Sequence, residues 1–237
     1  KFPKRFFWGK LQLEVSPCEL PILKFPHDIY KLLQFLCQQC WQQGTVPSLW
    51  KRDNRIYIPK PGKDSYHTEK SYRSLSLNSC VGKIYERVIA RRLIATLCEK
   101  NFFEQTQFAY LQNRDITQAL LSMTLSITEG FKNGEDTVAA LIDLEGAFDA
   151  IWRNGVIFKL FNYGIKGRLL LYIVSFLEHR MSRSLVNTHT TEWTQTHIGV
   201  PQGSIIAPLL FIIYISETST FLKLHIKYAD DIRSEEH

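Results

Sequence analysis

The sequence predicts an α+β fold, because two kinds of hydrophobic pattern alternate along it. Apolar residues at helical spacing run over 28–44 and 82–100, which predicts amphipathic helices. Apolar and polar residues alternate over 222–227, as is typical of a half-buried strand, and 137–142 is a continuous apolar run of strand length. Both predicted strands end in acidic residues, which are Asp143 after 137–142 and, after 222–227, the pair Asp230 and Asp231.

The composition is that of a globular protein with a hydrophobic core, since 45% of the 237 residues are hydrophobic. Lys and Arg number 29 against 23 Asp and Glu, a mild basic excess that fits a polyanionic partner and an ordinary solvated surface equally well. The longest apolar run, 205–215, contains Pro208 and is too short to cross a bilayer, and residues 1–10 lack the apolar core expected of a signal peptide. We therefore expect an intracellular protein of the cytoplasm or nucleus, neither secreted nor membrane-bound.

The first 27 residues carry four prolines and no hydrophobic period, so we expect an irregular lead-in. Asp28 is a candidate N-cap for the helix that follows, and Gly44 with Pro47 would end it. Cys37 and Cys40 form a CxxC pair on the apolar face of this helix. No second ligand pair follows at zinc spacing, so buried thiols are favoured over a metal site.

The elements expected before Asp143 are two strands joined by a turn, two helices and a buried strand. The two strands cover 55–58 and 71–77 with the turn at 59–64, the two helices cover 82–100 and 116–131, and the buried strand covers 137–142. Beyond Asp143 we expect two helices, two short strands, a tight loop, a buried helix and a last strand. The two helices cover 156–163 and 169–177, and the two short strands cover 184–187 and 193–197. The loop covers 199–204, the buried helix 205–215 and the last strand 222–227.

Asp143 and the pair Asp230–Asp231 would meet if their strands were neighbours in one sheet. Adjacent carboxylates repel each other unless a cation neutralises them, and hard oxygen ligands suit Mg²⁺ or Mn²⁺. Two such ions about 4 Å apart can activate a hydroxyl and stabilise the leaving group of an in-line phosphoryl displacement. A lone Asp-Asp pair would be a solvated turn, so the metal site depends on Asp143 joining it.

Seven short motifs follow one another along the chain. They are Val46-Pro47-Ser48-Leu49-Trp50-Lys51, Ile58-Pro59-Lys60-Pro61-Gly62-Lys63, Tyr72-Arg73-Ser74-Leu75-Ser76-Leu77, Gly82-Lys83-Ile84-Tyr85-Glu86-Arg87, Leu141-Ile142-Asp143-Leu144-Glu145-Gly146-Ala147-Phe148-Asp149, Gly199-Val200-Pro201-Gln202-Gly203-Ser204 and Tyr228-Ala229-Asp230-Asp231. In this order they resemble the reverse transcriptase domain of LINE-type (non-LTR) retrotransposons. The resemblance covers about residues 28–231. Any one motif is weak, and it is their shared order that makes coincidence implausible.

The resemblance implies the fingers and palm of a right-hand polymerase, with an antiparallel palm sheet backed by helices and the thumb absent. A reverse transcriptase domain would span 28–231 after the irregular lead-in 1–27. Its fingers would come from about 28–110 and 150–198, and its palm from about 111–149 and 199–231. The tail 232–237 would be atypical, because it lacks the apolar strand expected to complete the hairpin around the Asp-Asp turn.

The implied activity is RNA-directed DNA polymerisation, in which two Mg²⁺ (or Mn²⁺) ions assist nucleotidyl transfer from a dNTP to a primer 3′-hydroxyl on an RNA template. The resemblance makes Asp143, Asp230 and Asp231 the catalytic metal ligands, with the carbonyl of Leu144 as a further ligand. Asp149 is expected to be a cap or a structural partner instead.

The nucleotide would be held by residues carried over from the same motifs. Phe148 matches the steric gate that rejects a 2′-hydroxyl, whereas a plain core aromatic is the alternative without that alignment. Gln202 and the backbone of Gly203 would line the nucleotide and its template partner. Lys60 and Arg73 are candidates for the triphosphate, since cations stabilise charge there.

The chain also departs from the family pattern. Ser74 stands where the family usually has Pro, and Ala109-Tyr110-Leu111 stands where it usually has Gly-Phe-Arg. Together with the atypical tail, these departures leave open a truncated, catalytically inactive relic that at most binds nucleic acid. An RNA-dependent RNA polymerase with a similar palm is disfavoured by Phe148 and the Tyr-Ala-Asp-Asp form.

Overall fold

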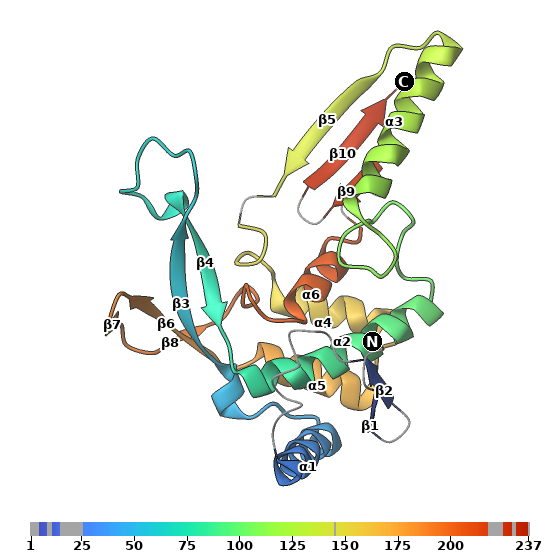
Figure 1. Cartoon of the computed structure of the whole chain (residues 1–237). Coiled ribbons are helices and arrows are strands. Elements are labelled where there is room, and N and C mark those ends of the chain that lie inside the picture. Colours follow the sequence, from blue (N-terminus) through green and yellow to red (C-terminus); the bar gives the residue numbers. More distant parts are fainter. Residues whose placement is uncertain are drawn as a thin grey trace.

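A computed structural model describes residues 5–8, 11–14, 26–144, 146–217, 225–228 and 231–236. Among these, 5–8, 11–14, 139–141, 143, 225 and 231–236 are described by their backbone alone. Two sheets rise from a helical base on different sides of the molecule, and α3 runs along the smaller sheet (Figure 1). The predicted α+β fold is confirmed.

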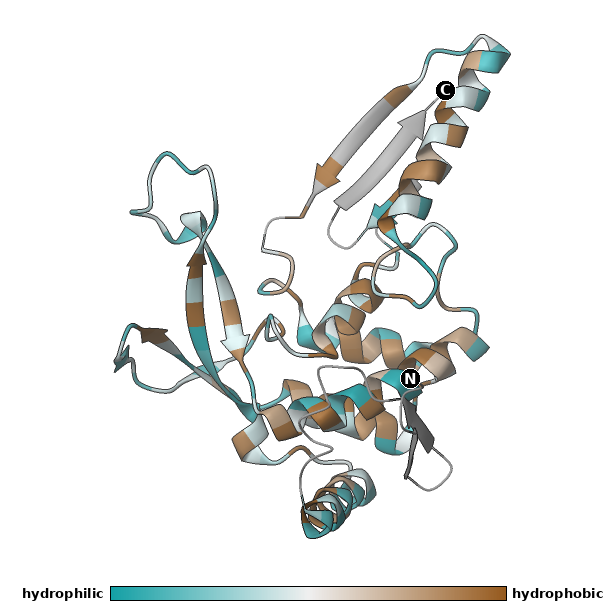
Figure 2. Cartoon of the chain, viewed as in Figure 1, coloured by the Kyte–Doolittle hydropathy of each residue, from teal (hydrophilic) through white to brown (hydrophobic). Residues whose placement is uncertain are grey.

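Five helices form the base: α1 (His27–Gln43), α2 (Cys80–Glu99), α4 (Arg153–Asn162), α5 (Gly167–Leu177) and α6 (Ala207–Tyr214). α1 packs on α5, and α4 packs on both α5 and α6. Hydrophobic residues concentrate along these helices (Figure 2), and α6 is buried along nearly its whole length, as its apolar sequence predicts. Most of the largest buried apolar side chains come from four of these helices, among them Ile89, Leu93, Leu160, Tyr172, Phe176 and Phe211.

The first helix differs from its expected form at its N-terminal end. α1 begins at His27 after an N-cap Pro26, so Asp28 lies in the first turn and does not cap the helix. The predicted apolar face is buried only in the second half, at Cys37 and Cys40, while Leu32 remains exposed. Burial raises the pKa of the Cys37 thiol to about 12, as is typical of an unreactive core cysteine.

The larger sheet contains β3 (Arg52–Pro59), β4 (Tyr72–Leu77), β6 (Arg180–Val186), β7 (His189–Thr190) and β8 (Thr194–Thr196). Its order is β4-β3-β6-β7, and β8 also pairs with β6 in antiparallel fashion. β3 and β4 form the predicted antiparallel hairpin, with the short helices η2 (Ser48–Lys51) before it and η3 (Glu69–Ser71) within its connection. β3 and β6 pair in parallel, which joins two segments far apart in the sequence.

The smaller sheet has the antiparallel order β5-β10-β9, formed by β5 (Val138–Asp143), β9 (His225–Tyr228) and β10 (Asp231–Glu236). The helix α3 (Ile116–Asn133) packs against β9, so the sheet is backed by a helix as expected. Two expectations are wrong here. Val138 and Ile142 on β5 are 69% and 42% exposed, because α3 packs on β9 at the opposite edge of the sheet and does not cover these side chains. The tail also supplies a strand after the Asp-Asp turn, since β10 pairs with both neighbours.

The N-terminal segment is more regular than its prolines suggest. β1 (Arg5–Trp8) and β2 (Leu11–Glu14) form an antiparallel pair, so the expectation of an irregular lead-in is wrong for these residues. Aromatic residues favour extended backbone, and this preference prevails between the prolines. None of the described helices is long and apolar enough to cross a membrane.

Candidate nucleotide site

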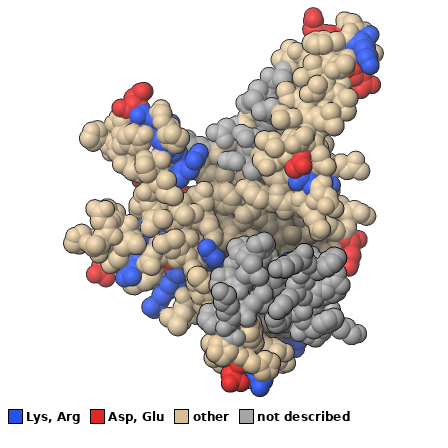
Figure 3. Space-filling view, in the orientation of Figure 1, with Lys and Arg blue, Asp and Glu red and all other residues tan. Residues whose placement is uncertain are grey.

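A cleft of about 620 Å³ lies between the β3–β4 hairpin and the segment that follows β5. Basic side chains gather on this hairpin (Figure 3), and the lining includes Arg55, Lys60, Lys70 and Arg73. The same lining contains two carboxylates, Glu69 and Asp149, so basic residues are in excess, and such an excess favours an anionic ligand such as a phosphate group.

Most of the predicted nucleotide-site residues line this one cleft. Lys60 and Arg73 lie on its hairpin side, Phe148 on the side of the segment after β5, and Gln202 on the loop before α6, whereas Gly203 is not part of the lining. The predicted metal ligand Leu144 lines the cleft as well. These residues come from three distant stretches of sequence, and the fold brings them together.

The acidic strand ends are juxtaposed by the register of the smaller sheet. Asp143 is the last residue of β5 and Asp231 the first of β10, and the two are direct partners across the antiparallel pair. Opposing residues in such a pair have Cα atoms about 5 Å apart. Asp230 lies outside the described residues, and the described side chains contain no group of three metal-ligating residues. The joint metal site therefore stays a prediction.

The loop 199–204 is fixed against the hairpin and α2. The carbonyl of Gln202 accepts a hydrogen bond from the backbone N–H of Ser76 at 2.7 Å, which attaches the loop to the edge of β4. The buried Glu86 carboxylate accepts hydrogen bonds from the Ser204 hydroxyl at 2.6 Å and from the Ile205 N–H at 2.8 Å. The sequence places Glu86 in a recognised motif but gives no sign of this role.

A second buried charge holds the segment before the loop. The Arg153 guanidinium donates hydrogen bonds to the backbone carbonyls of Leu177, Thr196, Ile198 and Gly199. It donates a further one to the hydroxyl of the Thr196 side chain. Burial lowers the pKa of Arg153 to about 10, so the side chain is still charged at neutral pH and its hydrogen bonds are charge-assisted. Arg153 thus fixes the backbone of the segment that leads into the loop carrying Gln202.

Phe148 is held in place by contacts of its ring and of its backbone carbonyl. Its ring stacks on Phe211 of α6 with centroids 5.2 Å apart and an interplanar angle of 29°. Its carbonyl accepts a hydrogen bond from the N–H of Val200 at 2.8 Å. The ring is half-buried and lines the cleft, which leaves part of it accessible to a ligand.

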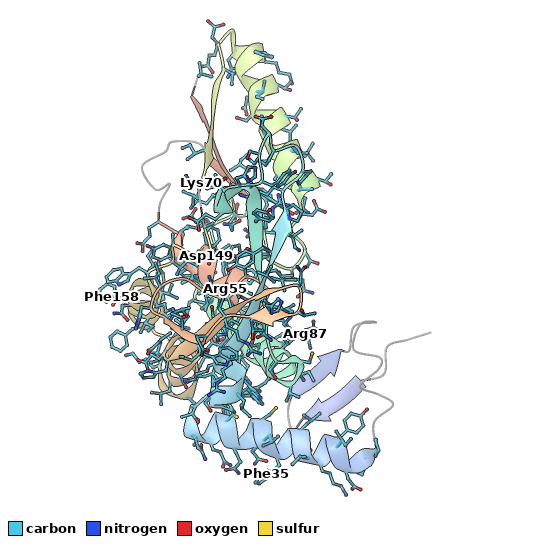
Figure 4. The ribbon with its side chains drawn as sticks, turned by 90° about the vertical axis from the view of Figure 1, so that its left-hand side faces the viewer. Phe35, Arg55, Lys70, Arg87, Asp149 and Phe158 are labelled. Atoms are coloured by element: carbon cyan, nitrogen blue, oxygen red, sulfur yellow. The ribbon has the colours of Figure 1, made fainter. Side chains whose placement is uncertain are left out.

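Asp149 reaches the hairpin across the cleft. Its carboxylate lies 3.7 Å from the Arg55 guanidinium and accepts a hydrogen bond from the Ser74 hydroxyl at 3.4 Å. Figure 4 shows Arg55 and Asp149 next to each other. Asp149 is therefore a partner of the hairpin, in keeping with the structural role expected for it.

Gly203 is expected to be intolerant of substitution because it lies against the hairpin backbone. Its φ is +125°, and a Cβ there would stand 2.6 Å from the carbonyl oxygen of Ser76. Gly203→Ala should lower the free energy of unfolding by about 2–4 kcal/mol, since both backbone strain and a clash are introduced. Chemical denaturation measures this loss. Gly62→Ala is the matched control, because Gly62 also has a positive φ but open space around it, and about 1 kcal/mol is expected there.

Comparison with known proteins identifies relatives of the chain. Residues 58–233 match the family model described as reverse transcriptase (RNA-dependent DNA polymerase). The probable RNA-directed DNA polymerase from transposon BS of Drosophila melanogaster is 31% identical over 94% of this chain and 26% of its own length. The RNA-directed DNA polymerase from mobile element jockey of the same species is 29% identical over 90% of this chain and 24% of its own. The chain thus spans about a quarter of these curated relatives.

Solved structures show a similar fold. An apo telomerase from Candida tropicalis, truncated from its C-terminal domain, superposes with a TM-score of 0.55 at 13% identity, over 89% of this chain and 49% of that one. A telomerase from Candida albicans in complex with a fragment of telomeric RNA gives a TM-score of 0.56 at 11% identity, over 89% and 43% of the two chains. At these identities the likeness concerns the fold alone.

Proposed function

The chain belongs to the reverse transcriptase (RNA-dependent DNA polymerase) family, and from this premise we propose that it is the polymerase core of a LINE-type (non-LTR) retrotransposon. The proposed reaction is transfer of a nucleotide from a dNTP to the 3′-hydroxyl of a DNA primer, directed by an RNA template. The observation that carries the proposal is the register that sets Asp143 opposite Asp231, next to a cleft lined by cations.

The donor set at the strand ends fits divalent cations. Asp143, Asp230 and Asp231 would hold two Mg²⁺ or Mn²⁺ ions with the carbonyl of Leu144, because carboxylates and carbonyls are hard oxygen ligands. Like charges directly opposite each other in a sheet are destabilising, which gives this arrangement a reason to bind cations. When bound, the ions activate the primer hydroxyl and stabilise the leaving pyrophosphate.

The remaining residues bind and orient the nucleotide. Lys60 and Arg73 attract the triphosphate, and a guanidinium can contact phosphate oxygens in a bidentate manner. The Phe148 ring packs against the sugar and leaves no room for a 2′-hydroxyl. Gln202 and the Gly203 backbone contact the nucleotide and its template partner, on a loop that Glu86 and Arg153 hold in place.

The proposal is tested by primer extension with the purified chain. A labelled DNA primer on an RNA template is incubated with dNTPs and Mg²⁺, next to Asp230→Asn and a sample with excess chelator. Binding of the primer–template duplex is measured in parallel. Extension that is lost in both comparisons, with duplex binding retained, supports a polymerase. Duplex binding without extension by the unaltered chain would favour the inactive relic.

A further inference from the structure

The dipeptide Phe148–Asp149 is held on the side away from the cleft by contacts of its backbone and of the Phe148 ring. The Phe148 ring stacks on Phe211, and its carbonyl is bonded to Val200. The backbone of Gly199 packs closely against that of Asp149, because a Cβ on Gly199 would lie 2.6 Å from the Asp149 carbonyl oxygen. These contacts come from the helical base and from the loop before α6. The Asp149 side chain adds a contact to the opposite wall of the cleft.

Arg55 is the cation that Asp149 contacts there, and it lies between two carboxylates, Asp149 and Asp53. The neighbouring carboxylate Asp53 is 3.8 Å from Arg55, but it already pairs with the buried Arg180 at 3.2 Å and accepts a hydrogen bond from Ser76 at 3.1 Å. The Arg55 Nε is buried and has no hydrogen-bond partner within the described part of the chain. Asp149 lies 3.7 Å from the Arg55 guanidinium, and among the described residues Arg55 is the cation it pairs with, whereas Asp53 also has Arg180.

Ser74 supplies the second contact from the hairpin. Its hydroxyl donates to the Asp149 Oδ2 at 3.4 Å, a bond that the proline usual at this position of the family pattern cannot make. Arg55 and Ser74 lie on β3 and β4, so the bridge ties both strands of the hairpin to the residue after Phe148.

We propose that Arg55, Asp149 and Ser74 form a positioning bridge that fixes the Phe148 ring and thereby sets how strongly the cleft prefers a deoxyribonucleotide to a ribonucleotide. This inference rests on the proposed function, in which Phe148 contacts the sugar. A gate residue excludes one extra oxygen only if its ring is held to within a fraction of an ångström. The bridge acts on the backbone next to that ring and needs no contact with the nucleotide.

The first test measures sugar selection. Single-nucleotide incorporation is followed with dATP and with ATP for the unaltered chain and for Asp149→Asn, Ser74→Ala and Asp149→Glu. The ratio of kcat/KM for dATP to that for ATP should fall about three- to fivefold in Asp149→Asn, the size expected for a partly exposed ion pair, and about twofold in Ser74→Ala, which removes one long hydrogen bond. Asp149→Glu should recover part of the ratio. Asp64→Asn, the same change on the exposed hairpin tip, should leave the ratio unchanged. An unchanged ratio in both bridge variants would overturn the proposal.

The second test does not depend on activity. A single 4-fluorophenylalanine is incorporated at position 148, and its ¹⁹F resonance is compared between the unaltered chain and Asp149→Asn. The bridge predicts a shifted or broadened resonance in the variant and no change in Asp64→Asn. An identical resonance in all three proteins would refute the bridge. If the unaltered chain extends no primer, the proposed function fails, while this resonance still decides whether Asp149 positions Phe148.

Discussion

Primer extension on an RNA template is expected to fall by about a thousandfold or more when Asp143 is replaced by asparagine. The amide keeps the size of the side chain but removes the charge that would neutralise a divalent cation. Single-turnover extension of a labelled primer at saturating dNTP and Mg²⁺ measures the loss. Asp136→Asn provides the matched control, because it makes the same change at an exposed residue just before β5 and should retain full activity.

The stability of the Asp143→Asn variant distinguishes the loss of a metal ligand from damage to the fold. Asp143 and Asp231 are direct partners in the register, so removing one of two opposed charges should leave metal-free stability unchanged or slightly raised. Retention of more than about a tenth of the activity would exclude Asp143 from the metal site. Loss of activity accompanied by a lower melting temperature would instead point to a structural role.

The largest effect on stability is expected for Arg180→Ala, with a loss of about 3–5 kcal/mol in the free energy of unfolding. Arg180 and Asp53 are 1% and 3% exposed and lie 3.2 Å apart. The guanidinium also donates to the side-chain oxygen of Asn78 and to the carbonyl of Phe176. Its removal would leave the Asp53 carboxylate buried without its main counter-charge.

Urea denaturation followed by circular dichroism measures this change. Arg168→Ala, on the exposed surface of α5, is the control and should alter stability by less than about 0.5 kcal/mol. The double variant Arg180→Met with Asp53→Leu should recover most of the loss, since a buried ion pair can be replaced by apolar residues of similar volume. A loss below about 1 kcal/mol in Arg180→Ala would show that Asp53 finds another partner, with Arg55 the nearest candidate.

The sequence predicts the elements whose signals are local. Helical periodicity gave α2, α3 and α5, and the turn residues at 59–64 gave the β3–β4 hairpin. The parallel pairing of β3 with β6 had no local signal, because nothing within either strand identifies a partner so distant in the chain. The exposure of Val138 was missed for a related reason. An apolar run shows that a strand forms, but its burial depends on what packs against it.

The candidate site likewise contains residues that the sequence identifies and residues that it does not. Lys60, Arg73, Phe148 and Gln202 could be named because each lies in a motif of fixed spacing, and the structure places all four around one cleft. The residues that hold them could not be named. Glu86 acts on a loop more than a hundred positions away, and such a charge is indistinguishable in sequence from one on a solvated helix face.

The central position of β10 has a consequence for how the protein folds. β10 lies between β5 and β9, which do not pair with each other, so the two outer strands of the smaller sheet are joined only when β10 docks. Its contacts with β5 join segments about ninety positions apart, and such long-range pairings form slowly because the intervening chain must first be ordered. The acidic strand ends thus come together late in folding. Until then, the chain lacks the opposed carboxylates on which its proposed chemistry depends.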